Sequence, residues 1–323
     1  MPEMNSRKAS RTGAVLSSMA MFVLAAWFMP YAGASPTQDP GTRWPAHAPT
    51  PEQVMYAQPE LMAQALDRLA PQDPKRIDLY LIAFAGDGGE NVFRNEVEYA
   101  ARLFARRFGA RGHTLVLENN PATLATAPLA DWTNLETALA AVHQVMDPRQ
   151  DILVLYLTSH GSEDHALWVN MPPLPLDPIG ARDLAGILAE NDFRWKVVIV
   201  NACYSGGFIA PLRNANTLII SSASADRTSF GCGSESQITY FADAFLVHAL
   251  NRTADFVAAF GQAGKLVRQW ERREKLPASD PGISAGKAVL AQLVKWRASH
   301  RPGPPVPFLP ASQNTTASPG ALP

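Results

Sequence analysis

The chain has few cysteines and no excess of charge of either sign. Its 323 residues include only two cysteines, which cannot form the disulfide framework of a small secreted scaffold. Lysine and arginine together number 28 and aspartate and glutamate 29, so the formal net charge is -1. Because nucleic-acid-binding domains need a basic surface, the sequence predicts no nucleic-acid partner.

Metal-binding patterns are also missing. The seven histidines are scattered, and neither a CxxC nor an HExxH spacing occurs. The sequence therefore predicts no metal site and no cofactor. Apolar residues, in contrast, make up 47% of the chain, which predicts a folded core.

Proline is concentrated near the two ends of the chain. Of the 27 prolines, seven lie within residues 30–59 and seven within residues 302–323. These flanks predict a Pro-rich linker over residues 35–60 and a Pro-rich disordered tail over residues 301–323. The remaining residues, 61–300, have the length of one domain.

The first 34 residues have the pattern of an export signal. Arg7, Lys8 and Arg11 precede an uncharged run over residues 12–29, and the small residues 32–34 (AGA) follow. This order predicts a cleaved signal peptide, and the length of the run leaves a retained membrane anchor as the alternative. Both predict a domain that is exported, periplasmic or secreted, with membrane contact only through this segment.

Continuous apolar runs alternate with amphipathic patterns along the domain. The runs predict buried strands, and the 3.6-residue spacing predicts helices. The predicted strands are residues 77–84, 114–117, 151–158, 196–200 and 217–221, and the predicted helices are residues 92–108, 134–146, 178–190, 241–250 and 254–276. Strands that are apolar on both faces and alternate with helices predict an α/β fold, in which helices cover both faces of a mostly parallel sheet.

Two reactive side chains each follow a predicted core strand. His160 follows one strand and Cys203 follows the next long one. In parallel sheets, ligands bind beyond the carboxyl ends of the strands, where the loops converge. Each residue alone would fit a structural role, as a surface histidine or a buried small hydrophobe. Their joint placement favours catalysis.

A thiol is a poor nucleophile until it is deprotonated. An adjacent imidazole raises the thiolate fraction and can later protonate the leaving amine. We therefore predict Cys203 as the nucleophile and His160 as general base and acid. The N–H of Gly161, together with the N–H of Cys203, is predicted to bind the developing oxyanion.

The motifs around these residues resemble the legumain family of cysteine peptidases, within the caspase-like clan. The similar segments, in the family's order, are residues 93–96 (FRNE), 158–161 (TSHG), 201–206 (NACYSG), 221–223 (SSA) and 239–243 (TYFAD). The resemblance implies a caspase-like three-layer sandwich and a cysteine endopeptidase. It also implies a peptide or protein substrate that is cleaved after Asn, and sometimes after Asp.

The resemblance further implies a substrate pocket. Arg94 and Asp243 correspond to the family's pocket arginine and aspartate, and Ser222 falls where the family has the pocket wall. A cation on one wall and a carboxylate on the other would satisfy both the acceptor and the donor of an asparagine amide.

Three positions depart from the family pattern. Asn201 and Tyr204 stand where the family often has glutamates, and Val92 aligns with the asparagine that supports the histidine, so no third catalytic residue is assigned. The nucleophile motif also resembles that of metacaspases. Open alternatives are therefore a metacaspase-like Arg/Lys-directed peptidase, a transpeptidase or ligase of the same fold, and a non-catalytic peptide-binding protein. Cys232 could be structural, redox-sensitive or a disulfide partner.

Overall fold

The computed structural model describes residues 44–233 and 235–310, which belong to one compact unit. The predicted signal or anchor at residues 1–34 lies outside the described residues, as do the start of the predicted linker and the last 13 residues of the predicted tail. No helix within the described part is both long enough and apolar enough to cross a bilayer.

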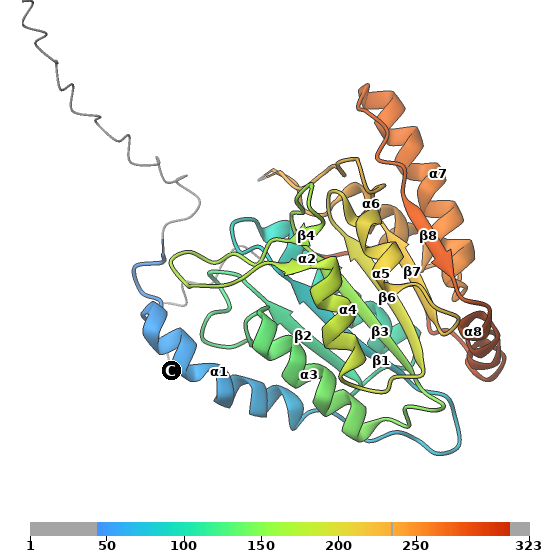
Figure 1. Ribbon diagram of the computed structural model, residues 1–323, viewed down its shortest axis with the longest axis horizontal. Helices are drawn as coiled ribbons and strands as arrows, with labels where there is room; N and C mark the ends of the chain where they lie inside the picture. The colour runs from blue at the N-terminus through green and yellow to red at the C-terminus, as the bar shows by residue number, and fades with distance from the viewer. Residues whose placement is uncertain (1–43, 234, 311–323) are drawn as a thin grey trace, which may run out of the picture. The chain divides into compact units, whose positions relative to one another are not determined.

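Helices and strands alternate along the chain (Figure 1). The strands of the main sheet are β1 (Leu79–Ala85), β2 (Thr114–Glu118), β3 (Ile152–Thr158), β6 (Trp195–Asn201), β7 (Thr217–Ser221) and β8 (Gly282–Ala285), and a small second sheet pairs β4 (Ala166–Leu167) with β5 (Ile179–Gly180). The α-helices are α1 (Pro51–Leu66), α2 (Asn91–Arg107), α3 (Trp132–Val145), α4 (Ala181–Ala189), α5 (Ile209–Leu212), α6 (Tyr240–Ala242), α7 (Phe256–Glu274) and α8 (Lys287–Ser299). A 3₁₀ turn, η2 (Ser205–Phe208), and a π-helical stretch, η3 (Asp243–Ala249), complete the elements.

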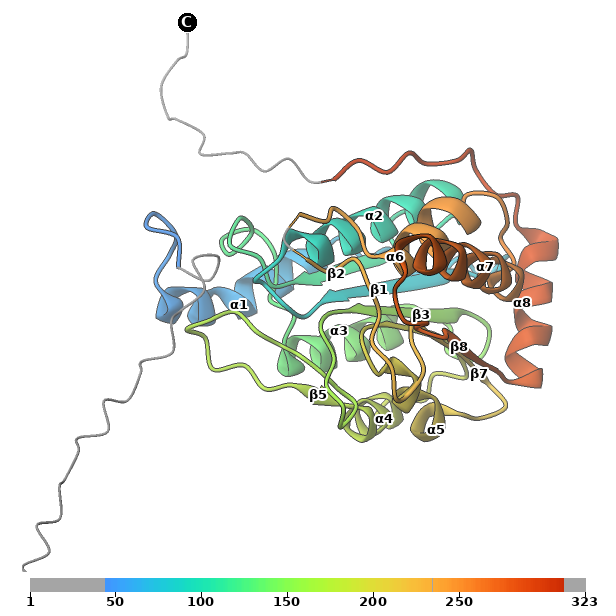
Figure 2. The ribbon, with the colours of Figure 1, turned by 90° about the horizontal axis from the view of Figure 1, so that it is seen from above.

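The main sheet has the strand order β2-β1-β3-β6-β7-β8, and only β8 runs antiparallel to its neighbour. Helices α2, α6 and α7 cover one face, and α3, α4 and α5 cover the other (Figure 2). Alternate residues of β3 enter the two cores: Val154 and Tyr156 pack on the side of α2, and Leu155 and Leu157 on the opposite side. The predicted three-layer α/β sandwich with a mostly parallel sheet is confirmed.

The predicted linker is shorter than expected, because residues 51–66 form helix α1. The Oγ1 of Thr50 accepts a hydrogen bond from the N–H of Gln53, and Pro51 occupies the first turn, where no amide hydrogen is needed. The side chains of Val54 and Met62 are buried. The high proline content of this segment therefore predicted a linker where the chain forms a capped helix.

The start of the predicted tail is also ordered against the domain. Val306 is buried, its carbonyl accepts from the Tyr99 hydroxyl at 2.8 Å, and its N–H donates to Asn251 Oδ1 at 2.8 Å. The N–H of Gly303 donates to the carbonyl of Arg107 at 2.9 Å. Proline lacks only its own N–H, so the other backbone groups of this segment still find partners.

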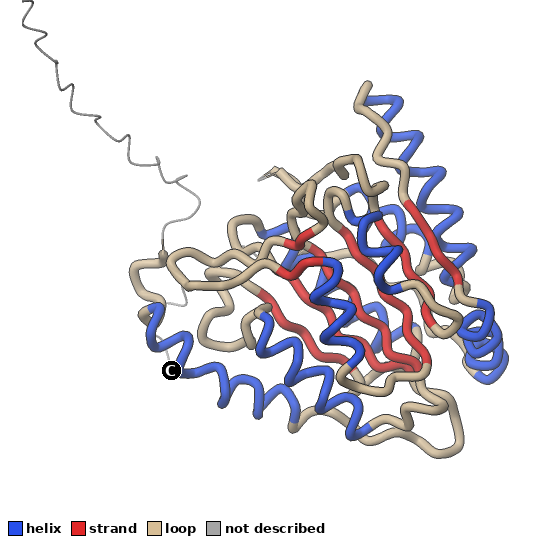
Figure 3. The backbone as a smooth tube through the Cα atoms, viewed as in Figure 1, coloured by secondary structure: helices blue, strands red, loops and turns tan. Residues whose placement is uncertain are grey.

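The sheet register brings the ends of β3 and β6 together. Thr158 lies beside Asn201, and the N–H of Ser159 donates to the Asn201 carbonyl at 3.3 Å. The segments that continue from these strands, and the long loop that follows β7, are drawn in tan in Figure 3. The loops that follow β3 and β6 therefore begin side by side at the same edge of the sheet.

Candidate active site

Cys203 lies two residues beyond the end of β6, in a tight turn. Its thiol is free and partly buried, and its Sγ accepts a hydrogen bond from the N–H of Ser229 at 3.3 Å. Tyr204 follows with φ 57, the left-handed conformation that turns the chain sharply into η2. The turn thus presents the thiol at the carboxyl end of a central strand.

Ser222, the predicted pocket-wall residue, lies directly after β7 and supports this turn. Its hydroxyl donates to the Ala202 carbonyl at 3.0 Å and accepts from the Ala202 N–H at 2.9 Å. The side chain is fully buried. Ser222 therefore fixes the backbone next to Cys203, and contact with a substrate stays a prediction.

His160 lies two residues beyond the end of β3. Because Thr158 and Asn201 are in register, His160 and Cys203 occupy equivalent positions past neighbouring strands. The imidazole packs edge-on against Phe93 and Trp168, with ring centroids 5.1 and 5.5 Å away. About a quarter of the side chain (27%) is exposed, so the ring is held by packing yet open to substrate.

A carboxylate that the sequence did not single out lies beside this imidazole. Glu90 Oε2 is 3.6 Å from His160 Nε2, and Glu90 is the residue directly before α2. A carboxylate at this distance favours one orientation of the ring. Its position at the carboxyl end of β1, within the GDGGE segment, was the available signal.

Gly161 brings the two loops into direct backbone contact. A Cβ atom at this position would lie 2.2 Å from the Cys203 carbonyl oxygen, which no side chain can tolerate. Gly161 also faces Leu167 in an antiparallel bridge, flanked by hydrogen bonds from the N–H of Ser162 to Ala166 O and from the N–H of Trp168 to His160 O.

This bridge determines where the Gly161 N–H points. Gly161 is in the non-hydrogen-bonded position of the bridge, so its N–H is directed away from Leu167. Within residues 44–233 and 235–310, the N–H of Cys203 has no hydrogen-bond acceptor either. Two adjacent loops thus offer unused backbone donors.

A second carboxylate that sequence reasoning missed lies beneath the site. Glu96 of α2 is fully buried, and its Oε2 accepts from the Tyr156 hydroxyl at 2.8 Å, the Thr158 hydroxyl at 2.6 Å and Asn201 Nδ2 at 2.8 Å. Its Oε1 accepts from the N–H of Thr239 at 2.8 Å. Burial raises the pKa of Glu96, whereas the hydrogen bonds from Thr158, Thr239 and Tyr156 lower it.

The sequence contains one signal for Glu96. It stands four residues after Val92 and four before Ala100, in the middle of the apolar stripe of the predicted helix. A charge on a buried helix face needs partners from elsewhere in the fold.

The two predicted pocket residues have different ion-pair partners. Arg94 Nε is 2.8 Å from Glu98 Oε1 and 4.0 Å from Glu118 Oε1, on the side of β2. Asp243 Oδ1, at the start of η3, is 3.6 Å from His248 Nε2. In the described part of the chain, Arg94 and Asp243 form no ion pair with each other. Their joint role in substrate binding stays a prediction.

Cys232 differs from Cys203 in its surroundings. Burial, together with the nearby Cys203 and Glu90, raises the pKa of the Cys232 thiol to about 11. Cys232 is therefore protonated at neutral pH and is a poor nucleophile. Both cysteines are free, and no cluster of three metal-ligating side chains occurs among the described residues.

Comparison with known proteins supports the resemblance found in the sequence. A model of the Peptidase C13 family matches residues 130–276, a segment that contains both His160 and Cys203. Among solved structures, the crystal structure of caspase-1 from Spodoptera frugiperda is similar at 12% identity and a TM-score of 0.43, over 65% of this chain and 87% of that one. No curated protein matches this chain. The family match confirms the resemblance to legumains and the enzyme class, a cysteine peptidase.

Proposed function

We propose that this cysteine peptidase of the C13 type hydrolyses peptide bonds through a dyad of Cys203 and His160. The observation that supports the proposal is the register of β3 and β6, which starts the two loops side by side. Gly161 then lies against the Cys203 carbonyl, so the loops stay adjacent as far as the reactive residues.

The reaction follows from these positions. The Cys203 thiol gives its proton to His160, and Sγ bonds to the carbonyl carbon of the substrate. The oxyanion that forms accepts hydrogen bonds from the N–H groups of Gly161 and Cys203. His160 then protonates the leaving amine as the C–N bond breaks, and a thioester remains on Cys203.

Water completes the cycle. His160 removes a proton from a water molecule, which attacks the thioester carbonyl and releases the acid product together with the Cys203 thiol. Glu90 faces Nε2 of His160, which leaves Nδ1 for these proton transfers. We assign Glu90 as a positioning residue, because it acts through His160.

The substrate side of the proposal rests on the legumain resemblance. We propose that the domain is exported or anchored to the membrane and cleaves a peptide or protein after Asn or Asp, with Arg94, Asp243 and Ser222 as candidate substrate-binding residues. Arg94 would then have to exchange its ion pair with Glu98 for a contact with the substrate.

The test is hydrolysis by the full chain of a peptide library varied at the residue before the scissile bond (P1), read by mass spectrometry. Cys203→Ala and His160→Ala should each lower kcat/KM more than about a thousandfold. Cys232→Ala is the matched control, since it removes the chain's other thiol, and it should retain activity. Undiminished cleavage by Cys203→Ala would refute the proposed dyad. Ligated products with an added amine would instead indicate a transpeptidase.

A further inference from the structure

A large aromatic side chain is exposed next to His160. Trp168 is 48% exposed, although tryptophan is highly buried on average. The centroid of its ring lies 5.5 Å from that of the His160 imidazole, in an edge-on contact. A single exposed apolar side chain is common on protein surfaces, but this one contacts the predicted general acid. Trp168 is therefore a candidate contact for the substrate.

The backbone around Trp168 is held in place by several contacts. Its N–H donates to the His160 carbonyl at 3.0 Å, and its carbonyl accepts from the Ser159 hydroxyl at 2.6 Å. A Cβ atom on Gly86, directly after β1, would lie 2.4 Å from the Trp168 carbonyl oxygen, so the two segments pack closely. The position of Trp168 beside His160 is thus fixed by the main chain and does not depend on the indole.

The two neighbours of Trp168 explain why its indole points outward. Leu167 and Val169 are both buried and belong to the same apolar cluster. The burial of residues 167–169 follows the alternation of a strand, in which successive side chains point to opposite faces. Turning the indole inward would expose both neighbours. The exposure of Trp168 is therefore a consequence of the local structure.

The two aromatic contacts of His160 differ in accessibility. Phe93, whose ring centroid is 5.1 Å from that of the imidazole, is 1% exposed and covers His160 from the interior. Trp168 covers it from the solvent side. Of the two rings, only the indole presents surface that a substrate can cover.

The position of Trp168 indicates which part of the substrate it contacts. In the proposed reaction His160 protonates the leaving amine, so that nitrogen lies within hydrogen-bond reach of the imidazole. The nitrogen belongs to the residue directly after the scissile bond (P1′), and the P1′ side chain branches from the carbon bonded to it. Because the indole touches the imidazole, it is within reach of the P1′ side chain.

We propose that Trp168 is a specificity residue that binds an apolar or aromatic side chain at P1′. This inference rests on the proposed function, because it extends the same site to the leaving group. Packing of such a side chain on the exposed part of the indole removes apolar surface of both partners from water. A cation on an exposed indole gains less than a buried aromatic pair, so Phe is preferred over Lys, and Gly is the poorest P1′ residue.

The test measures binding of intact peptides to the full chain carrying Cys203→Ala, so that it does not depend on hydrolysis. The peptides share one sequence and have Phe, Leu, Lys or Gly at P1′. Each is made with Asn, Asp, Lys or Arg at P1, so that the comparison does not depend on the P1 preference. By calorimetry, we expect the best Phe peptide to bind about tenfold more tightly than its Gly counterpart, with Leu between them.

Trp168→Ala in the same background should bring the Phe-to-Gly ratio close to one, and Trp168→Phe should keep most of it. Tyr56→Ala is the matched control, because it removes a ring on α1 that is 79% exposed, and it should keep the original ratio. Thermal melting monitors the folding of each variant. If Trp168 only orients His160, Trp168→Ala will slow hydrolysis of every peptide alike and leave the binding ratio unchanged.

Equal binding of the Phe and Gly peptides, or tighter binding of Lys than of Phe, would overturn the inference. So would a ratio that Trp168→Ala leaves unchanged, or a lack of binding by every peptide. Hydrolysis by the chain with Cys203 intact is measured in parallel. P1′-selective binding without cleavage would refute the proposed hydrolysis and leave the Trp168 contact intact, whereas cleavage without P1′ selectivity would do the reverse.

Discussion

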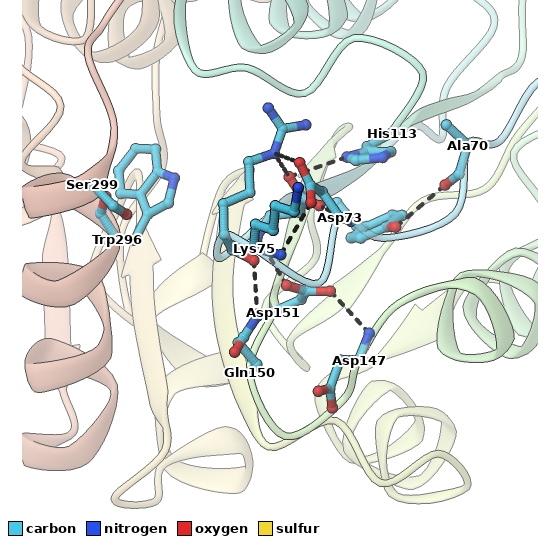
Figure 4. Close-up of polar contacts among 12 residues, drawn as sticks. Ala70, Asp73, Lys75, His113, Asp147, Gln150, Asp151, Trp296 and Ser299 are labelled. Atoms are coloured by element: carbon cyan, nitrogen blue, oxygen red, sulfur yellow. Dashed lines mark hydrogen bonds and ion pairs between the residues drawn. The ribbon is translucent and has the colours of Figure 1, made fainter.

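The two ends of the main sheet both contain buried carboxylates, and their partners differ. At the amino ends of β1 and β3, the carboxylates of Asp78 and Asp151 are hydrogen-bonded or ion-paired through all their oxygens. Figure 4 shows Asp151 among its polar neighbours. Asp151 accepts from the N–H groups of Asp78 at 2.8 Å and Asp147 at 2.9 Å. Asp78 accepts from the N–H of Asp73 at 2.8 Å and faces Arg76 Nε at 2.7 Å. All four carboxylate oxygens have a partner.

At the carboxyl ends, two polar groups lack a hydrogen-bond partner among the described residues. The N–H of Cys203 has no acceptor within the described residues, and Asn201 Oδ1 has no donor there. Glu96, which anchors this region, is as buried as the aspartates at the other end. Buried carboxylates are therefore common to both ends, and an unpartnered buried atom, His113 Nδ1, also occurs at the amino end. What distinguishes the carboxyl end is that its unpartnered groups lie beside the predicted nucleophile.

The largest effect in this comparison is expected for Gly161→Ala at the carboxyl end. The new Cβ would collide with the Cys203 carbonyl oxygen at 2.2 Å, so the two loops must separate and the oxyanion donors move. We expect kcat to fall about 100-fold or more, with KM much less affected. Steady-state kinetics on a peptide substrate measure this. Gly186→Ala, where a Cβ would meet nothing within 4 Å, is the matched control. Equal activity of the two variants would contradict the account.

A smaller effect is expected for Glu90→Gln. The variant keeps the size of the side chain and removes the charge beside His160 Nε2. Loss of a charged contact of this length should lower kcat about five- to tenfold, with the fold and KM unchanged. Measuring kcat and the melting temperature together distinguishes a role of Glu90 in positioning His160 from a role in stabilising the fold. Glu60→Gln on α1 is the control, and a fall in melting temperature without a fall in kcat would argue for a structural role of Glu90.

The smallest effect on activity is expected at the amino end. Asp151→Asn keeps one acceptor and turns the other into a donor that faces a backbone N–H. Since the leftover N–H is buried, we expect the free energy of unfolding to fall by about 1–3 kcal/mol, with kcat/KM unchanged. Denaturant titration and the peptide assay measure the two quantities. A loss of activity without a loss of stability would contradict the prediction that the amino end is structural and the carboxyl end catalytic.

The same variant has a pH signature. Burial raises the pKa of Asp151 to about 6, above its ordinary value of 3.8. The folded state therefore holds this proton more tightly than the unfolded chain. The stability that this provides is fully present below pH 3.8 and is lost as the pH rises through about 6. The stability difference between wild type and Asp151→Asn should accordingly be larger at pH 4 than at pH 8.

The sequence predicts the strand ends well, because continuous apolar runs mark β1, β3 and β6. His160 and Cys203 follow such runs directly, so their placement past β3 and β6 could be read without a structure. The edge strand β8 has no such run, since its residues (GISA) are half exposed, and neither it nor α8 was predicted.

The residues that contact Glu96 and His160 could not be predicted from the sequence in the same way. Glu96 meets Thr158, Asn201 and Thr239 only after three separate segments have packed together. The local sequence pattern shows a charged residue on an apolar helix face. It does not show which residues donate hydrogen bonds to that charge. The pairing of Glu90 with His160 likewise depends on the β1 and β3 loops meeting in space.

The most direct test of the central claim compares the reactivity of the two thiols. Iodoacetamide labelling of the full chain at pH 7, with each cysteine quantified by peptide mapping, reports nucleophile activation without a substrate. Because the pKa of Cys232 is raised to about 11, that thiol provides an internal standard. The account predicts that Cys203 is labelled much faster than Cys232, and that His160→Ala removes most of this advantage. Equal labelling rates, or a Cys203 rate that His160→Ala does not change, would contradict it.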